Sequence, residues 1–217
     1  DLGRVTQYYC DPDLAETLVN HSTDTVQWLH GRGVRFVPRF GRYAFKHEGK
    51  FKFFGGTVVE ATGGGRGLVE AEYKAAVKFG VDIRYGVRAT GLLRGPTGIC
   101  GVRVETKGVE EEIQAKAVVI AAGGFEANRE WRTRYLGAGW EMAKVRGTRF
   151  NTGDGIRMAL DAGAQAYGQW SGCHSVSWER YAPDFGELDR PITASRNGYP
   201  FSLMINANGE RFVDEGA

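Results

Sequence analysis

The stretch AVVIAAGGF, residues 117–125, constrains the fold of this chain more than any other feature. Its apolar residues follow one another without polar alternation, which is typical of a strand covered on both faces. The strand runs directly into a glycine pair, as strands of nucleotide-binding sheets do beside a dinucleotide. The chain has no proper GxGxxG phosphate-binding loop ahead of this strand. We therefore expect a buried strand whose phosphate-binding neighbour lies elsewhere.

The composition is that of a soluble globular domain. Of the 217 residues, 42% are hydrophobic and 25% charged, and the formal net charge is +2. The Lys and Arg residues are scattered, which argues against a nucleic-acid partner. No apolar run approaches the roughly 20 residues of a transmembrane helix. The 32 glycines exceed the average of about 7% and gather at turns and strand ends, which indicates close backbone approaches, as around a cofactor.

The three cysteines, Cys10, Cys100 and Cys173, lack CxxC or CxxH spacing. This pattern argues against a disulfide framework and against a metal site. We expect a reducing, cytoplasmic compartment, with membrane association through a partner left open. The chain has no initiating Met or signal peptide, and both of its ends look cut, so we expect a segment of a longer protein.

The first quarter of the chain predicts two helices followed by short strands. Asp11 and Pro12 suit a helix start, and Ser22 or Thr23 can cap a second helix. Residues 34–56 are rich in aromatic side chains and lack a helical period, which predicts short hairpin-like strands around a loop.

The rest of the chain predicts an α/β (α+β) fold. Residues 62–85 predict a glycine-rich loop, a helix and the strand VDIRY. Residues 86–116 alternate apolar and polar side chains between the turn signals GPTG and TKG, as in an antiparallel meander. Residues 153–165 predict a capped helix ending at Gly163, and NANG near residue 208 predicts a hairpin turn. We place a domain boundary near Asn128.

The motif TGGGRGL, residues 62–68, is a candidate anion site because its helix start aims N–H groups and a positive dipole end outward. Its spacing differs from GxGxxG, since Leu68 occupies the third glycine position. A Rossmann interpretation would depend on Gly63, Gly65 and the acid Asp82. A plain glycine-rich turn between strand and helix explains the motif equally well.

Four motifs occur in one order: TGGGRGLVEAEYKAAVKFGVDIRYGVRATGLL, AVVIAAGGF, NTGDGIRMALDAGA and NANGERFVDE. This order resembles the FAD-dependent fumarate reductase and succinate dehydrogenase flavoprotein family, and within it the tricarballylate dehydrogenase-like branch, over most of residues 31–217. The resemblance implies that residues 1–127 are the middle of an FAD-binding domain and residues 128–217 the first part of a substrate-capping domain. The family's GxGxxG unit has no counterpart here, so we expect the isolated chain to bind FAD weakly or not at all and to be inactive alone.

The resemblance also implies cofactor contacts along the chain. The glycine-rich helix start would pass the flavin ring, a backbone position near residue 87 would pair with adenine, the strand end would lie along the adenosine and pyrophosphate, and the loop before the last helix would skirt the ring. The implied residues are Gly63, Gly64, Gly65, Val87, Ala122, Gly123, Gly124, Thr152, Gly153, Asp154 and Gly155. Thr152 or Asp154 would equally suit an ordinary helix N-cap.

For catalysis, the resemblance points to His174 and Arg196 as the residues that hold substrate carboxylates, and an Arg fork suits a carboxylate. It implies a dehydrogenase or reductase that acts on a small di- or tricarboxylate such as tricarballylate, with a separate electron-transfer partner left open. The acid or base is expected beyond residue 217. Arg211 and Glu215 match the family's RF…E element, and a hairpin salt bridge explains them nearly as well.

Two other functions stay open at this point. A stand-alone NAD(P)-binding module would use GGGRG as its pyrophosphate loop, and a non-catalytic interaction domain would need no cofactor. Nucleophilic catalysis is unsupported, because Ser171, Cys173 and His174 are neighbours in sequence without a nucleophile elbow or a partner acid.

Overall fold

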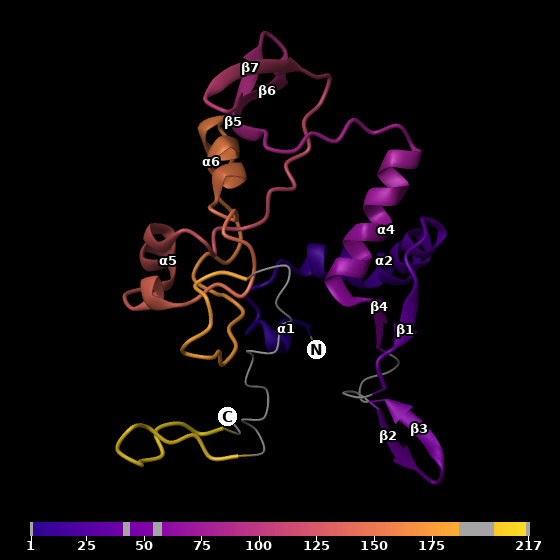
Figure 1. The fold of residues 1–217 in the computed structure, drawn as a ribbon, viewed down its shortest axis with the longest axis vertical. Coiled ribbons are helices and arrows are strands. Elements are labelled where there is room, and N and C mark those ends of the chain that lie inside the picture. The colour runs from indigo at the N-terminus through magenta and orange to yellow at the C-terminus, as the bar shows by residue number, and fades with distance from the viewer. Residues whose placement is uncertain (1, 41–43, 54–57, 187–201, 216–217) are drawn as a thin grey trace. The chain divides into compact units, whose positions relative to one another are not determined.

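A computed structural model describes residues 2–40, 44–53, 58–186 and 202–215 (Figure 1). The chain divides into two compact units, Asp1–Tyr85 and Gly86–Ala217. Helices and small antiparallel sheets occur together, which confirms the predicted α/β (α+β) class. The boundary expected near Asn128 lies inside the second unit, and the division into a flavin-binding part and a capping part stays a prediction.

The first unit opens with a short helix α1, Leu2–Val5, and a long helix α2, Pro12–Gly31. Asp11 caps α2 as the sequence predicts. Its Oδ1 accepts hydrogen bonds from the backbone N–H groups of Asp13 and Leu14, both at 2.9 Å. Two of the N–H groups that a helix start leaves unpaired are thereby satisfied.

The prediction of two helices in this region was wrong, because α2 is continuous. The Ser22 hydroxyl donates to the carbonyl of Val19 at 2.9 Å, and Thr25 likewise donates to the carbonyl of His21 at 2.8 Å. Hydroxyls that bond back to the preceding turn allow the helix to continue, whereas a capping hydroxyl would accept a bond from the following N–H groups.

Short strands follow, as predicted. β1 (Phe36–Pro38) pairs antiparallel with β4 (Val59–Ala61), and β2 (Ala44–His47) pairs with β3 (Lys50–Phe53) as a hairpin. The two turn residues at 48–49 both have positive φ, 50° and 75°. Such a turn matches the twist of the two strands and closes the hairpin locally.

Helix α4, Gly64–Lys78, starts immediately after β4 in a very tight turn. A Cβ atom on Gly67 would lie 1.9 Å from the carbonyl oxygen of Thr62, so only glycine fits at this position. The strand expected at residues 81–85 is not formed. This prediction was wrong because no described segment pairs with these residues, and an unpaired extended segment gains no ladder hydrogen bonds.

The predicted meander is confirmed. β5 (Arg88–Gly95), β6 (Gly98–Thr106) and β7 (Val109–Gln114) form one antiparallel sheet in that order. Leu93 and Val104 are buried on this sheet. They form part of the small apolar core of the second unit.

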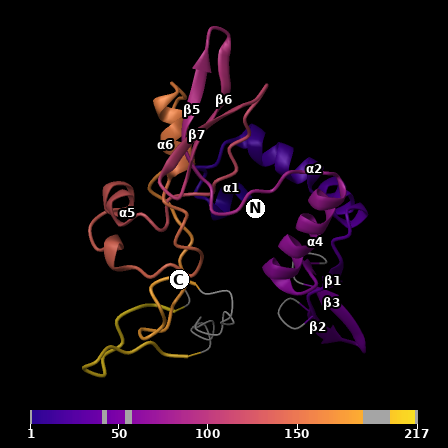
Figure 2. The same ribbon diagram turned by 45° about the horizontal axis from the view of Figure 1, so that its top comes forward.

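The stretch after the meander departs from the prediction. Residues 115–124 belong to no helix or strand and run as a coil from β7 toward α5 (Figure 2). Val119 is 89% exposed, so the prediction of a strand buried on both faces was wrong. The reason is physical: a buried parallel strand needs hydrogen-bonded neighbours on its edges, and among the described residues none lies alongside it.

The described residues of the second unit also form the helical elements α5 (Arg129–Leu136), η1 (Trp140–Met142) and α6 (Asp154–Asp161). Figure 2 shows α6 beside the β5–β7 sheet, and α6 contacts β5. The expected helix is thus confirmed within residues 153–165; α6 ends at Asp161, and Gly163 follows with a φ of 92°. Within the described parts of the chain, none of the helices is long and apolar enough to cross a membrane.

The predicted turn near the end of the chain is also present. Ile205 and Arg211 form an antiparallel bridge, and Gly209 has a φ of 81° between them. The Asn206 Oδ1 accepts from the backbone N–H groups of Asn208 and Glu210 at 2.9 and 3.0 Å. This side chain closes the turn together with backbone hydrogen bonds from Asn206 to Glu210 and from Gly209 to Asn206.

The contact between Gly67 and Thr62 gives the first prediction. Gly67→Ala should lower the free energy of unfolding by about 1–3 kcal/mol, because the added methyl group overpacks a backbone turn. Gly65→Ala is the matched control, since a Cβ at this position meets no atom within 4 Å and alanine favours the helix. Urea denaturation followed by circular dichroism measures both variants. Equal midpoints would show that the turn is not constrained as described.

Candidate functional site

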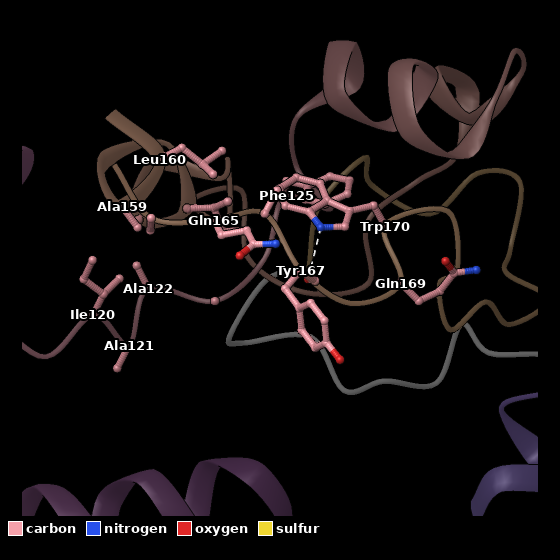
Figure 3. A pocket seen from close by; sticks show the side chains of 15 residues that line it. Ile120, Ala121, Ala122, Phe125, Ala159, Leu160, Gln165, Tyr167, Gln169 and Trp170 are labelled. Atoms are coloured by element: carbon pink, nitrogen blue, oxygen red, sulfur yellow. Dashed lines mark hydrogen bonds between the residues drawn. The ribbon is translucent and has the colours of Figure 1, made fainter. Parts of the chain in front are cut away.

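A pocket of about 510 Å³ lies in the second unit (Figure 3). Its walls come from the coil before α5, from α6 and from the segment after α6. The lining residues are Ile120, Ala121, Ala122, Gly123, Phe125, Gly155, Ile156, Ala159, Leu160, Ala164, Gln165, Ala166, Tyr167, Gln169 and Trp170. None of them carries a formal charge, so the pocket suits an apolar or flat aromatic group better than an ion.

One wall depends on a close approach between the coil and α6. A Cβ atom on Gly155 would lie 2.7 Å from the Ile120 Cγ2 and 2.8 Å from the Ala122 Cβ. Any larger residue at 155 would push the two segments apart. Figure 3 shows Ile120 and Ala122 at the same end of the pocket as Ala159.

The other end of the pocket is aromatic. Phe125, Trp131, Tyr135 and Trp170 form a cluster in which the rings of Phe125 and Trp170 stack at 6.0 Å and those of Tyr135 and Trp170 approach to 4.8 Å. The Trp170 Nε1 donates to the carbonyl of Tyr167 at 3.2 Å, which fixes the indole (Figure 3). Mutually packed rings of this kind form a flat and rigid wall.

The start of α6 is held without an N-cap side chain. Gly153 is the N-cap with a φ of 84°, and a Cβ atom there would lie 2.7 Å from the Trp131 ring. Neither Thr152 nor Asp154 makes a capping hydrogen bond, so the ordinary N-cap interpretation is not supported. The Asp154 carboxylate instead accepts from Arg88 Nη2 at 2.8 Å and Nε at 3.3 Å. This hydrogen bond and the charge of Asp154 raise the pKa of Arg88.

A buried arginine holds the loops beside the aromatic cluster. Arg132 is 5% exposed and donates to the carbonyls of Trp140 at 2.9 Å, Glu141 at 3.1 Å and Ala143 at 3.0 Å, and also to that of Glu126. Burial lowers the pKa of Arg132. Four carbonyls thus replace water around a buried cation and join two segments that no sheet connects.

Asn151 packs against Gly123, the first residue of the pair Gly123–Gly124. Its Nδ2 donates to the Glu126 Oε1 at 2.5 Å, and its side chain lies 2.9 Å from where a Cβ on Gly123 would be. The neighbouring Asn128 Nδ2 donates to the carbonyl of Thr152 at 3.0 Å. The residues before α5 and those before α6 therefore form one hydrogen-bonded frame.

Several of the residues expected at a cofactor site meet in this frame. Ala122, Gly123 and Gly155 line the pocket, and the Gly153 N–H donates to the carbonyl of Gly124 at 3.0 Å. Asp154 is bonded to Arg88, the residue after Val87. Segments that lie far apart in the sequence, at residues 87, 122–124 and 152–155, are thereby connected.

Other expected residues lie elsewhere. Gly63, Gly64 and Gly65 form the start of α4 in the first unit and are exposed. His174 is exposed and does not line the pocket, and Arg196 lies outside the described residues. The roles expected for these residues stay predictions.

Sequence reasoning missed four residues that shape the site: Arg88, Trp131, Arg132 and Asn151. The spacing of Trp131 and Tyr135, four residues apart on α5, was a usable signal, because such residues share one helix face. Arg132 and Asn151 gave no signal, since their partners are backbone carbonyls and a glycine that only the folded chain brings near.

Near the end of the chain, Arg211 Nε and Nη2 both donate to the Glu215 Oε2, at 3.0 and 2.6 Å. The Met204 N–H donates to the other oxygen of this buried carboxylate. The hydrogen bond from Met204 and that from Arg211 lower the pKa of Glu215 to about 2. This geometry is that of a hairpin salt bridge.

The described residues contain no group of three His, Cys, Asp or Glu side chains that could hold a metal ion. The pocket beside α6 offers a different surface. Its uncharged lining and fixed backbone suit the binding of a ring, with polar contacts supplied by amides and peptide groups.

The comparisons with known proteins agree on one family. All of residues 1–217 match the family model described as FAD binding domain. The chain is 28% identical to the vinyl phenol reductase of Lactiplantibacillus plantarum, over 97% of this chain and 42% of that protein. It is also 28% identical to the probable fumarate reductase Ifc3 of Shewanella frigidimarina, over 94% of this chain and 33% of that protein. The chain thus spans less than half the length of these relatives.

A solved structure shares the fold. The open conformation of a flavocytochrome c3 fumarate reductase superposes with a TM-score of 0.73 over 99% of this chain and 36% of that one. The sequence identity is 24%, so this likeness concerns the fold alone.

The low pKa of Glu215 predicts a pH dependence. A folded pKa of about 2, below the value of roughly 4.3 in an unfolded chain, means that Glu215 stabilises the turn fully above the unfolded value. This contribution is lost as the pH falls toward the folded value. The protection of the Met204 amide from hydrogen exchange should therefore decline between about pH 4.3 and 2.

Glu215→Gln should show low protection of this amide at every pH, and Glu16→Gln, at an exposed position of α2, should behave as the parent chain. A Met204 protection factor that is independent of pH over this interval would contradict the assignment.

Proposed function

Because the chain belongs to the FAD binding domain family, we propose that it supplies part of the cofactor site and of the substrate cap in an FAD-dependent oxidoreductase. In this proposal residues 1–127 belong to the flavin-binding domain and residues 128–217 begin the cap. The single observation that carries the assignment is the family match over the whole chain. The NAD(P) alternative loses support, because the family that matches is one that binds FAD.

The pocket supports the cofactor part of this proposal. Its volume of about 510 Å³ and its uncharged, aromatic lining suit a flat ring. It offers no cation for the phosphates, whose partners would be backbone N–H groups, as at a helix start. In the first unit, Cβ positions on Gly64 and Gly65 meet no atom within 4 Å, so the backbone at the start of α4 is open to the close approach expected of a flavin ring.

The individual roles follow the motif order. Gly63, Gly64 and Gly65 would lie along the flavin ring, Val87 would pair with adenine, and Ala122, Gly123 and Gly124 would lie along the adenosine and pyrophosphate. Thr152, Gly153, Asp154 and Gly155 would border the ring from the cap side. The contacts of residues 122–124 with residues 153–155 support a single site for these two segments.

Bound FAD would supply hydride transfer to or from a carbon of the substrate. The residues of this chain would bind and orient the substrate. His174 and Arg196 would hold the carboxylates of a small di- or tricarboxylate such as tricarballylate, with Arg196 binding bidentately. Fixed donors of this kind stabilise the charge that develops next to a carboxylate during proton transfer. The likeness to a probable fumarate reductase supports a dicarboxylate-type substrate, and a separate electron-transfer partner belongs to the same proposal.

Filling the pocket tests the cofactor role. In the full-length protein, Ala159→Trp should lower the flavin content and weaken FAD binding about tenfold or more, because the indole occupies the space of a ring. Arg157→Gln is the matched control on the same helix, since this exposed side chain pairs with Asp161 outside the pocket. The ratio of flavin absorbance to protein absorbance measures both variants. Full flavin loading of the tryptophan variant would contradict the assignment of the pocket.

The substrate role has its own test. His174→Ala in the full-length protein should raise KM for tricarballylate or fumarate about tenfold, the loss expected for one charge-assisted hydrogen bond, with a smaller change in kcat. The control is His21→Ala on α2, which should leave KM unchanged. Turnover of a vinyl phenol in preference to both carboxylates would contradict the proposed substrate class.

A further inference from the structure

Two arginines of β5 reach the two ends of α6. Arg88, the first residue of the strand, binds the carboxylate of Asp154, the first residue of α6, through two hydrogen bonds of 2.8 and 3.3 Å. Arg94, near the other end of the strand, donates from Nη2 to the carbonyl of Ala162, which follows the last residue of α6. The sheet register shifts just before Arg94, and such irregularities redirect side chains.

Both contacts suit the electrostatics of a helix. A carboxylate at the first position faces the positive end of the helix dipole, and a guanidinium at the last carbonyls faces the negative end. Gly163 lies directly beside the second contact, since a Cβ there would be at an ordinary contact distance of 3.4 Å from Arg94 Nη2. Since α6 has only 8 residues, its own hydrogen bonds hold it weakly and outside contacts decide its position.

The position of α6 matters because this helix forms a wall of the pocket. Gly155 and Ala159 line it, and Gly155 touches the coil at Ala122. Arg88 also follows Val87 directly, so its pair with Asp154 joins two segments that are 66 residues apart and belong to the same proposed cofactor site. We infer that Arg88 and Arg94 are positioning residues that hold α6 at both ends and thereby fix the pocket wall. The positioning of α6 by these arginines does not depend on which ligand binds. An effect on FAD affinity rests on the proposed function.

The first test uses the full-length protein without added FAD. In Arg88→Ala, hydrogen exchange of the α6 amides should rise about two- to fivefold, as expected for the loss of an exposed ion pair at a helix end. Arg94→Ala should raise exchange in the last turn, and Arg88→Lys should keep part of the protection. Arg103→Ala is the matched control, because this arginine of β6 pairs with Glu112 of β7. An unchanged α6 exchange rate in Arg88→Ala would overturn the inference.

A second arm shows whether Arg88 acts through Asp154. In an Asp154→Asn background, Arg88→Ala should add no further increase in α6 exchange, because the partner charge is already gone. An undiminished increase would overturn the positioning role.

A titration of the same variants with FAD separates the positioning role of the arginines from the proposed cofactor role of the pocket. Arg88→Ala should weaken FAD binding about two- to fivefold, in proportion to its effect on α6 exchange, and Arg103→Ala should not. Faster α6 exchange with unchanged FAD affinity would support the positioning role of Arg88 and contradict the proposed cofactor role of the pocket. Unchanged exchange of the α6 amides in Arg88→Ala would overturn the positioning role, whatever the affinity for FAD.

Discussion

The second unit depends on the direct packing of the coil at residues 120–122 against the first turn of α6. With 2.7 Å from the Gly155 Cβ position to Ile120 and 2.8 Å to Ala122, there is no room for a side chain between them. This contact brings the end of an apolar stretch next to a helix start. The pocket, the aromatic wall and the meeting of the expected cofactor segments all follow from that arrangement.

Side chains, rather than a sheet, hold the loops around this contact. Arg132 binds four backbone carbonyls in a buried position, Asn151 packs against Gly123 and bonds to Glu126, and Arg88 anchors α6 to β5. The buried guanidinium of Arg132 is stabilised because its donors are satisfied by peptide oxygens. Polar side chains therefore hold these loops together, while the surface that lines the pocket is uncharged and largely apolar. This combination suits a site that binds a flat ring and leaves the charged parts of a ligand to other segments.

The features that the sequence predicted well are local. The meander, the helix before Gly163 and the turn at Asn206 each depend on turn residues and periodicity within about ten positions of the chain. The strand expected at residues 117–122 failed because strand formation needs a hydrogen-bonded neighbour, which no local pattern specifies. The single long α2 was missed because the choice of the Ser22 hydroxyl between capping and bonding backward is not visible in the sequence. The cofactor role that family resemblance implies for Gly123, Gly153 and Gly155 stays a prediction, and the side chains that pack against these glycines were visible only in the fold.

Hydrogen exchange of the full-length protein, compared with and without FAD, tests most directly whether this frame is a cofactor site. Peptides covering residues 120–125 and 153–160 should gain protection together when FAD binds, whereas residues 109–114 of β7, which do not line the pocket, should not. Protection confined to other parts of the protein, with both pocket segments unchanged at saturating FAD, would contradict it.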